Sequence, residues 1–354
     1  MAIDKELINN ILSYSLSREG LTIEVYLASA RNVTAEAKDG AADALERAES
    51  SGLSIRVLNG ARHGFSYTND LSKWRETLDM ALQTAAYTEE DINWSFKGDC
   101  QKYESVKTYD DAAFAVSESD ILTMALGIEQ AALSTDEKVK KVRKASASVS
   151  CGELYIANTR GLSGGYRFTS CTLSAMAMAQ TGGDSQMGWE YEYNRSLSGI
   201  SPQRVGKGAA TRALELLNAQ RFKSVKTPVV IENSVASDFL SLLASSLSSE
   251  NVQKGKSILS GRLSDLVVSQ KINIIDNALL DGKAGSRPFD GEGVPSRRNA
   301  LITDGVLNGF LYNMYTASKG GAVSTANAIR GGISGIPTVG VSNLYIEPSS
   351  SKYT

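Results

Sequence analysis

Alternation of apolar and polar residues in two runs, residues 145–149 and 173–180, limits the fold more than any other feature of this sequence. Ala145, Ala147 and Val149 alternate with serines, and residues 173–180 alternate leucine and alanine with serine, methionine and glutamine. Period two places successive side chains on opposite faces of a strand, and antiparallel sheets with one buried face show this pattern. We therefore predict antiparallel strands, with turns at the following glycines: Gly152, Gly161, Gly164, Gly165, Gly182 and Gly183.

The rest of the chain mixes helical and strand periods. Residues 3–12 carry isoleucine and leucine at helical spacing, and residues 23–27 then alternate, so a helix leads into a strand. An antiparallel hairpin is predicted around Asn59 and Gly60, because this pair accepts positive φ. Further helices are predicted from an N-cap at Ser72, after Ser117, and from Ser201, where the following proline costs no hydrogen bond.

Towards the C-terminus, a short apolar strand is predicted at residues 228–231, before a helical stripe at 235–247. The chain beyond Asn251 is rich in glycine and has short strand-like runs. We predict an α+β fold in which residues 1–145 form an antiparallel sheet with packed helices. Residues 146–354 form a larger, strand-rich domain, and the boundary rests only on the change in sequence texture.

Composition excludes several classes of function. The 37 lysines and arginines nearly balance the 39 aspartates and glutamates, so no global field attracts nucleic acid or an anionic membrane. Neither an export signal nor an apolar run of eighteen residues is present, so we expect no contact with a membrane. Cys100, Cys151 and Cys171 form no CxxC pair, and this favours a reducing compartment, the cytoplasm.

The sequence has one histidine, His63, so a mechanism that needs two histidines from one chain is excluded. A lone histidine beside a hairpin turn is more often a solvated loop residue than a catalytic base. Neither of two glycine-lysine segments makes a nucleotide-binding loop. Glu250 stands where the phosphate loop before Lys256 needs glycine, and Lys207 lies inside a helical stripe.

Residues 286–295 hold the densest cluster of unusual residues, with Asp290 and Glu292 two positions apart and glycine on both sides of Glu292. Paired carboxylates can bind a hard cation or share a proton. Composition favours the alternative, a tight surface turn in which Asp290 bonds the backbone. A second cluster, between Thr316 and Arg330, offers hydroxyl and amide donors that could line a peptide groove or fold a loop.

These clusters, in this order, resemble those of the TldD/PmbA family. The similarity rests on residues 287–295, 304–307, 316–317, 324–327 and 343–344 and, near the N-terminus, on Arg56-Val57 followed by the run at 64–72. It covers the chain from the first helix to the end. Family members continue through another stretch of sheet beyond this point, so we expect the C-terminal domain to be incomplete.

The resemblance implies zinc chemistry in only one branch of the family. TldD-like members carry a His-Glu-x-x-x-His motif on a helix before a Lys-Gly-x-Ser turn, and PmbA-like members lack the motif. This sequence has the turn at residues 254–257, with Leu240, Ser241 and Ser245 at the motif positions. None of these three ligates zinc in the usual way. We expect no cofactor in this chain and zinc in a TldD-like partner.

The resemblance further implies a non-catalytic subunit that pairs with a TldD-like paralogue, completes a cleft for unfolded peptides, and forms a homodimer when alone. The expected substrate-binding residues are Asp290, Glu292, Thr316, Ser324, Thr325 and Asn327. Two alternatives stay open. One is a protein-interaction modulator, related to gyrase or to toxin-antitoxin systems, without a hydrolytic role. The other is a hydrolase that uses Asp290 and Glu292 with a metal.

Overall fold

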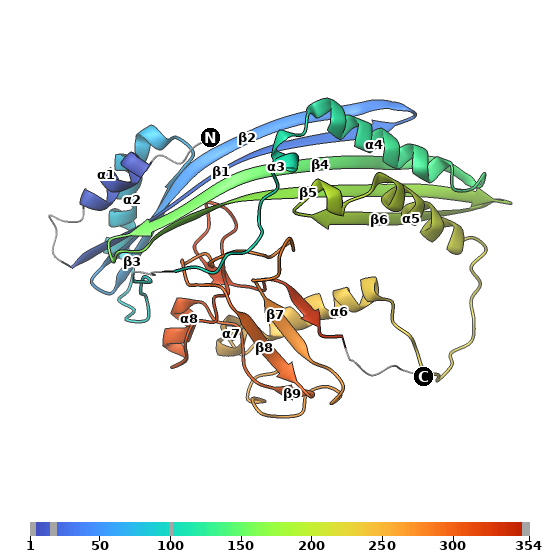
Figure 1. Cartoon of the computed structure of the whole chain (residues 1–354). Helices are drawn as coiled ribbons and strands as arrows, with labels where there is room; N and C mark the ends of the chain where they lie inside the picture. Colours follow the sequence, from blue (N-terminus) through green and yellow to red (C-terminus); the bar gives the residue numbers. More distant parts are fainter. Residues whose placement is uncertain (1–4, 15–19, 99–101, 349–354) are drawn as a thin grey trace.

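A computed structural model describes residues 5–14, 20–98 and 102–348. Ile3, at the start of the first predicted helix, and Cys100 lie outside these ranges. Within them, six strands form one antiparallel sheet that arches across the molecule (Figure 1) in the order β3-β2-β1-β4-β5-β6. The strands are β1 (Leu21–Lys38), β2 (Ala41–Asn59), β3 (Arg62–Thr68), β4 (Val139–Asn158), β5 (Ser163–Thr181) and β6 (Asp184–Asn194).

Alternation sorts the side chains of each strand onto two faces of this sheet. On β1, Ile23 and Val25 are fully buried against helices, whereas Glu24 and Tyr26 lie on the opposite face. Because Glu24 pairs in register with Arg56 of β2, these two side chains share that second face. We call it the cleft face, since the C-terminal part of the chain packs against it.

Two pairs of helices cover the other face (Figure 1). One pair packs on β1, β2 and β3, and the second pair packs on β1, β4 and β5. In the second pair, Ser117 and Ser201 are the N-caps of the helices that were predicted to begin after them. The predicted cap at Ser72 is wrong: Asp70 caps a short 3-10 turn that precedes the helix from Trp74. The helices are α1 (Lys5–Ser13), α2 (Trp74–Tyr87), α4 (Glu118–Leu133) and α5 (Pro202–Glu215), with the short α3 (Asp111–Ala115) before α4.

At several strand positions only glycine fits, because another group packs directly against the backbone there. A Cβ on Gly64 of β3 would stand 1.9 Å from the carbonyl oxygen of Ala81 in α2. The predicted turns at Gly182 and Gly183 are confirmed, with φ of 53° and 93°. The predicted turns at Gly152, Gly164 and Gly165 are wrong, because these glycines lie inside β4 and β5. At Gly152 and Gly165 an aromatic ring from the neighbouring strand fills the space above the glycine.

The C-terminal part lies below the arch in Figure 1 and contains a small antiparallel sheet of order β12-β7-β8-β9. The strand predicted at 228–231 is wrong: this segment has no regular structure, and Val230 is 99% exposed. The elements are α6 (Asn233–Ser246), α7 (Ser249–Gln253), β7 (Ile274–Asn277), β8 (Arg298–Thr303), β9 (Val306–Leu307), α8 (Met314–Lys319), β10 (Ala328–Ile329), β11 (Thr338–Val339) and β12 (Leu344–Ile346).

The predicted α+β class, the antiparallel pairing and the hairpin at Asn59 and Gly60 are confirmed. The predicted division at residue 145 falls inside β4, which pairs with β1 over fourteen residue pairs, so the large sheet continues across that position. Cys151 and Cys171 are buried free thiols. No helix in the described part of the chain is long and apolar enough to cross a bilayer.

Candidate functional site: a cleft beside a buried charge network

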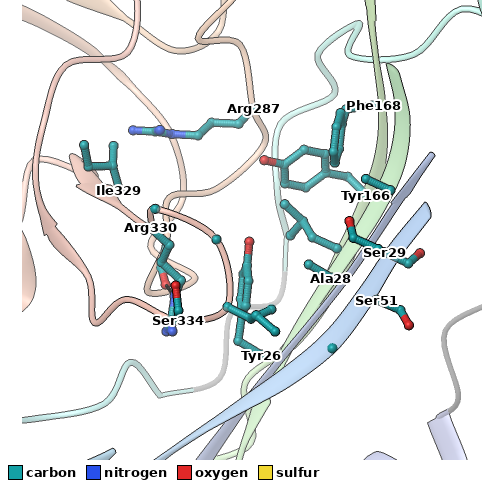
Figure 2. Close-up of a pocket in the computed structure, with 18 of the residues that line it drawn as sticks. Tyr26, Ala28, Ser29, Ser51, Tyr166, Phe168, Arg287, Ile329, Arg330 and Ser334 are labelled. Atoms are coloured by element: carbon teal, nitrogen blue, oxygen red, sulfur yellow. Dashed lines mark hydrogen bonds between the residues drawn. The ribbon is translucent and has the colours of Figure 1, made fainter. Parts of the chain in front are cut away.

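A cavity of about 630 Å³ lies between the cleft face of the sheet and two loops of the C-terminal part. Its sheet side is built from Tyr26 on β1 and from Tyr166 and Phe168 on β5. Its other side carries Arg287 and Arg330 from the loops before β8 and after β10. Figure 2 shows the two tyrosine hydroxyls directed into this space. We refer to this cavity as the cleft.

A network of buried charges forms the floor beside the cleft and joins the sheet to the C-terminal part. Arg56 donates two hydrogen bonds to Glu24, at 2.7 Å from Nε and 2.9 Å from Nη2. Arg330 reaches the same carboxylate at 2.5 Å, and Arg56 Nη1 lies 3.5 Å from Glu292. All four side chains are at most 2% exposed. Removing one member would leave a buried charge unpaired, which generally costs about 3–5 kcal/mol.

Burial and neighbouring charges set the protonation of this network. Burial opposes ionisation of Glu24, but Arg56 and Arg330 prevail and lower its pKa. Burial raises the pKa of Glu292 to about 7, with Asp290 adding to the rise and Arg56 opposing it. The pKa of Asp290 is also raised by burial. Glu292 is therefore the carboxyl in this network that gains or loses a proton near neutral pH.

Asp290 organises the loop from which Glu292 projects. Its Oδ1 accepts hydrogen bonds from the backbone N–H of Glu292 and Val294, and its Oδ2 accepts from Ala328. The predicted bonding of Asp290 to the backbone is confirmed. The expectation of a surface turn is wrong, because Asp290 is 2% exposed and Glu292 is 1% exposed. The loop is buried because the sheet closes over it.

The remaining predicted binding residues lie in the C-terminal part with partners of their own. Thr316 belongs to the capping box of α8, and the Ser324 and Thr325 hydroxyls donate to the carbonyl of Tyr312. The Asn327 amide donates to Asp276 and to the carbonyl of Gly340. The structure therefore brings Asp290 to the cleft wall and Glu292 to the adjoining network, and gives the other four visible roles in folding loops. Their part in binding substrate stays a prediction.

His63 is a correction to the sequence analysis. Instead of a solvated loop residue, it is a buried residue of β3, stacked on Trp94 at 4.2 Å between ring centroids. Trp94 stacks in turn on Tyr315 of α8. Burial, with Arg56 adding to the effect, lowers the pKa of His63 to about 4, so its ring is neutral at physiological pH. The stack links the N-terminal and C-terminal parts of the chain.

Sequence reasoning did not predict the arginines and aromatic residues of the cleft as site residues. Arg287 and Arg330 stand inside the segments that drew attention, but the carboxylates and hydroxyls there carried the interpretation. Tyr26 and Tyr166 stand at positions of alternating strands that face away from the helix-covered side. Their place in the alternation was the one sequence signal that could have identified them. A polar-face position occupied by tyrosine or arginine on neighbouring strands indicates that a second layer covers that face.

The three positions that correspond to the zinc motif lie on α6 and do not fit a zinc ion. The Ser241 and Ser245 hydroxyls donate to the backbone carbonyls of Ser237 and Leu242, and Leu240 has no ligating atom. Within residues 5–14, 20–98 and 102–348, no group of three or more His, Cys, Asp or Glu side chains gathers as a metal site. The donor set of this helix is therefore unlike that of a zinc peptidase.

Comparison with known proteins decides the family. Residues 23–87 match the model of PmbA/TldA metallopeptidase domain 1, residues 111–217 the central domain, and residues 224–354 the C-terminal domain. The chain belongs to the PmbA/TldD metallopeptidase family. Within this family it is 28% identical over 317 residues to the metalloprotease PmbA of Escherichia coli O157:H7, covering 88% of this chain and 69% of that protein.

Solved structures share the fold of this chain. A candidate modulator of DNA gyrase from Thermotoga maritima superposes with a TM-score of 0.90 at 26% identity, covering 99% of this chain and 78% of that one. TldE from Thermococcus kodakarensis gives a TM-score of 0.86 at 20% identity, covering 97% and 78%. The second likeness concerns the fold alone.

Proposed function

We propose that this chain is a non-catalytic, peptide-binding subunit of a PmbA/TldD-type metallopeptidase. The observation that carries the proposal is the combination of a built cleft of about 630 Å³ with an α6 helix on which Leu240, Ser241 and Ser245, the positions that correspond to the zinc motif, offer no zinc ligand. Pockets of 300–1,000 Å³ are typical of ligand sites. The chain thus has a place for a substrate but not the ligand set for the metal chemistry of its family.

A TldD-like paralogue completes the enzyme in this proposal. When bound in that partner, zinc supplies a Lewis acid and an activated water. The residues of the present chain hold an extended peptide and exclude water from it, using the aromatic wall of Tyr26, Tyr166 and Phe168. Extended peptides are commonly captured beside sheets through backbone hydrogen bonds and side-chain pockets.

The surface around α6 supports an assembly of this kind. Phe239 and Leu242 are 58% and 72% exposed on α6, and the preceding segment exposes Phe222, Val229 and Val230. Large exposed apolar surfaces commonly mark interaction sites, and these side chains lie on two segments that adjoin in the sequence. We call Phe239 and Leu242 with residues 222–231 the α6 surface. We propose that it receives the paralogue, or a second copy of this chain when the paralogue is absent.

The test is reconstitution of the two subunits. We expect an unfolded protein substrate to be cut by the mixture and not by this chain alone. Ala30→Trp, which fills the cleft from β1, should reduce cleavage by the mixture at least tenfold while the chain stays folded. Ala42→Trp, at the exposed far end of β2, is the matched control. Full cleavage by this chain alone would refute a non-catalytic role, and unchanged cleavage by the Ala30→Trp mixture would remove the cleft from function.

A further inference from the structure

The charged groups around the cleft carry an excess of positive charge. Arg195, Arg287 and Arg330 line it, and Asp290 is the carboxylate on its wall. Three backbone amides donate to the oxygens of Asp290, and Arg287 acts on this carboxylate through its charge, without an ion pair between them in the described residues. Of the three arginines, Arg330 has a carboxylate partner, Glu24, which it shares with Arg56. No ion pair in the described residues involves Arg195 or Arg287.

Two of these arginines keep buried donors without a partner. The Arg330 side chain is 1% exposed, and among the described residues no acceptor lies within hydrogen-bond distance of its Nη1. The Nε of Arg287 is likewise buried with no acceptor, and its Nη2 makes one long contact of 3.5 Å with the carbonyl of Ala326. Buried donors without partners are rare and each has a cost in stability. A bound acceptor would remove this cost.

Arg195 differs from Arg287 and Arg330 in its hydrogen bonds, and this difference reduces the number of arginines that can bind a ligand in the cleft. Its guanidinium donates to the backbone carbonyls of Thr169, Lys283 and Ala284, so its nitrogens are engaged although its charge is not neutralised. Its positive charge adds to the electrostatic potential of the cleft, and its hydrogen bonds hold the loop at 283–286 near the sheet. The free donor capacity on the cleft wall therefore belongs to Arg287 and Arg330.

The tyrosines add neutral donors to the same space. Burial raises the pKa of Tyr166 to about 12, and burial raises that of Tyr26 against the lowering effects of Arg330 and Arg287. Both phenols therefore keep their protons at neutral pH. Figure 2 shows their hydroxyls entering the cleft from the sheet side, with Arg287 and Arg330 on the loop side.

We propose that the cleft recognises a peptide carboxylate, with Arg287 and Arg330 as its charged donors and the Tyr26 and Tyr166 hydroxyls as neutral ones. A carboxylate presents several acceptor sites to guanidinium groups, and charge-assisted hydrogen bonds of this kind are about twice as strong as neutral ones. The inference rests on the proposed function, because it names the part of a peptide substrate that the cleft selects. The carboxylate is either the C-terminus of the peptide or an acidic side chain.

A polyanion fits this site less well than a peptide carboxylate. Nucleic-acid grooves track a backbone with a stripe of basic residues, whereas the free donors here are confined to one cavity with aromatic walls. The balanced charge of the whole chain likewise gives no steering field for a phosphate backbone. Binding of inorganic phosphate is therefore an outcome that the experiment must separate.

Calorimetric titration of the isolated chain tests the inference with defined probes. Acetyl-tetra-alanine with a free C-terminal carboxylate should bind at least tenfold more tightly than the same peptide with a C-terminal amide. An amidated peptide with one internal glutamate distinguishes a side-chain carboxylate from the C-terminus. The preference should fall to less than threefold in Arg287→Gln and stay unchanged in Arg262→Gln, an exposed arginine paired with Asp265.

The outcomes separate this inference from the proposed function. Equal binding of all three peptides, no binding of any of them, or tighter binding of inorganic phosphate than of both peptides that carry a carboxylate would overturn it. So would an intact preference in folded Arg287→Gln, with folding checked by circular dichroism. A carboxylate preference without any cleavage by the reconstituted pair would instead leave this inference standing and refute the proposed subunit role.

Discussion

Glu292 is the residue whose protonation connects the cleft network to pH. Its pKa is about 7 in the folded chain, above the ordinary value near 4.5, because it is buried. The folded state therefore binds the proton more tightly than the unfolded state does. This contribution to stability is fully present below pH 4.5 and is lost as pH rises through 7. At 1.36 kcal/mol per unit, the loss amounts to roughly 3 kcal/mol.

We predict that Glu292→Gln removes this part of the pH dependence. Urea unfolding should show the difference between wild type and variant changing by roughly 3 kcal/mol from pH 4.5 to 7.5, with the variant gaining relative stability as pH rises. His63 has the opposite effect over a similar pH range. Because its pKa is lowered to about 4 in the folded state, its contribution to stability increases as pH rises from 4 to 6.5. The difference between the two curves cancels the His63 contribution. A difference that does not vary with pH would contradict the prediction.

At this scale, sequence reasoning found Asp290 and Glu292 because two carboxylates among glycines are unusual. It did not find the partners of Glu24, which lie 32 and 306 positions away. Period two assigns a residue to a face of a strand, but it does not say which distant loop covers that face. Long-range charge pairing depends on the packing of the two layers, and that information is absent from local spacing.

Helix-to-strand distance is controlled by glycine at the scale of secondary-structure elements. Gly64 lets α2 lie against β3, and Gly188 does the same for α5 on β6, where a Cβ would stand 2.2 Å from the carbonyl of Ala209. In both contacts the opposing atom belongs to a helix backbone. A side chain cannot swing aside there, so the whole helix would have to move.

We predict that Gly64→Ala destabilises the chain by about 2 kcal/mol or more, since overpacking typically costs 1–3 kcal/mol. Thermal unfolding followed by circular dichroism measures the effect. Gly309→Ala is the matched control, because nothing lies within 4 Å of a Cβ at that position and its φ is not positive. Equal melting temperatures for the two variants would show that α2 has slack against β3.

Most elements with a strong period were predictable, and the failures have physical causes. The helices from residues near 74, 118 and 202 follow from their apolar stripes and caps. The glycines at 152 and 165 were mistaken for turns, because cross-strand aromatic contacts of glycine leave no trace in local sequence. The strand predicted at 228–231 needs a pairing partner, and an apolar run alone does not supply one.

Across the whole molecule, the α6 surface is the place where assembly can be measured. We predict that this chain self-associates in the absence of a paralogue, and that Phe239→Ser with Leu242→Ser weakens association at least tenfold in sedimentation velocity. Tyr87→Ser with Ile92→Ser, two exposed apolar residues at and just beyond the end of α2, is the matched control. A monomer at all concentrations in wild type, or equal association in the two double variants, would contradict the prediction.

The division of the chain was the least predictable feature at this scale. The change of composition near residue 145 falls inside β4, at the seventh of its 20 residues. Small residues dominate there because α4 and α5 pack closely on that half of the sheet, as the buried Ala145 and Ala147 show. The change of composition near residue 145 thus reflects the helices that cover this part of β4. The sheet itself continues through residue 145.

The bond between Glu24 and Arg330 has a consequence for how the chain is made. At 5–20 residues per second, a ribosome reaches residue 330 roughly 15–60 s after residue 24, and hairpins form far faster than that. The arch can therefore assemble while its Glu24–Arg56 pair still faces water. Emergence of the last third of the polypeptide then dehydrates that pair. Arg330 then forms its salt bridge with Glu24 after most of the nascent chain has folded.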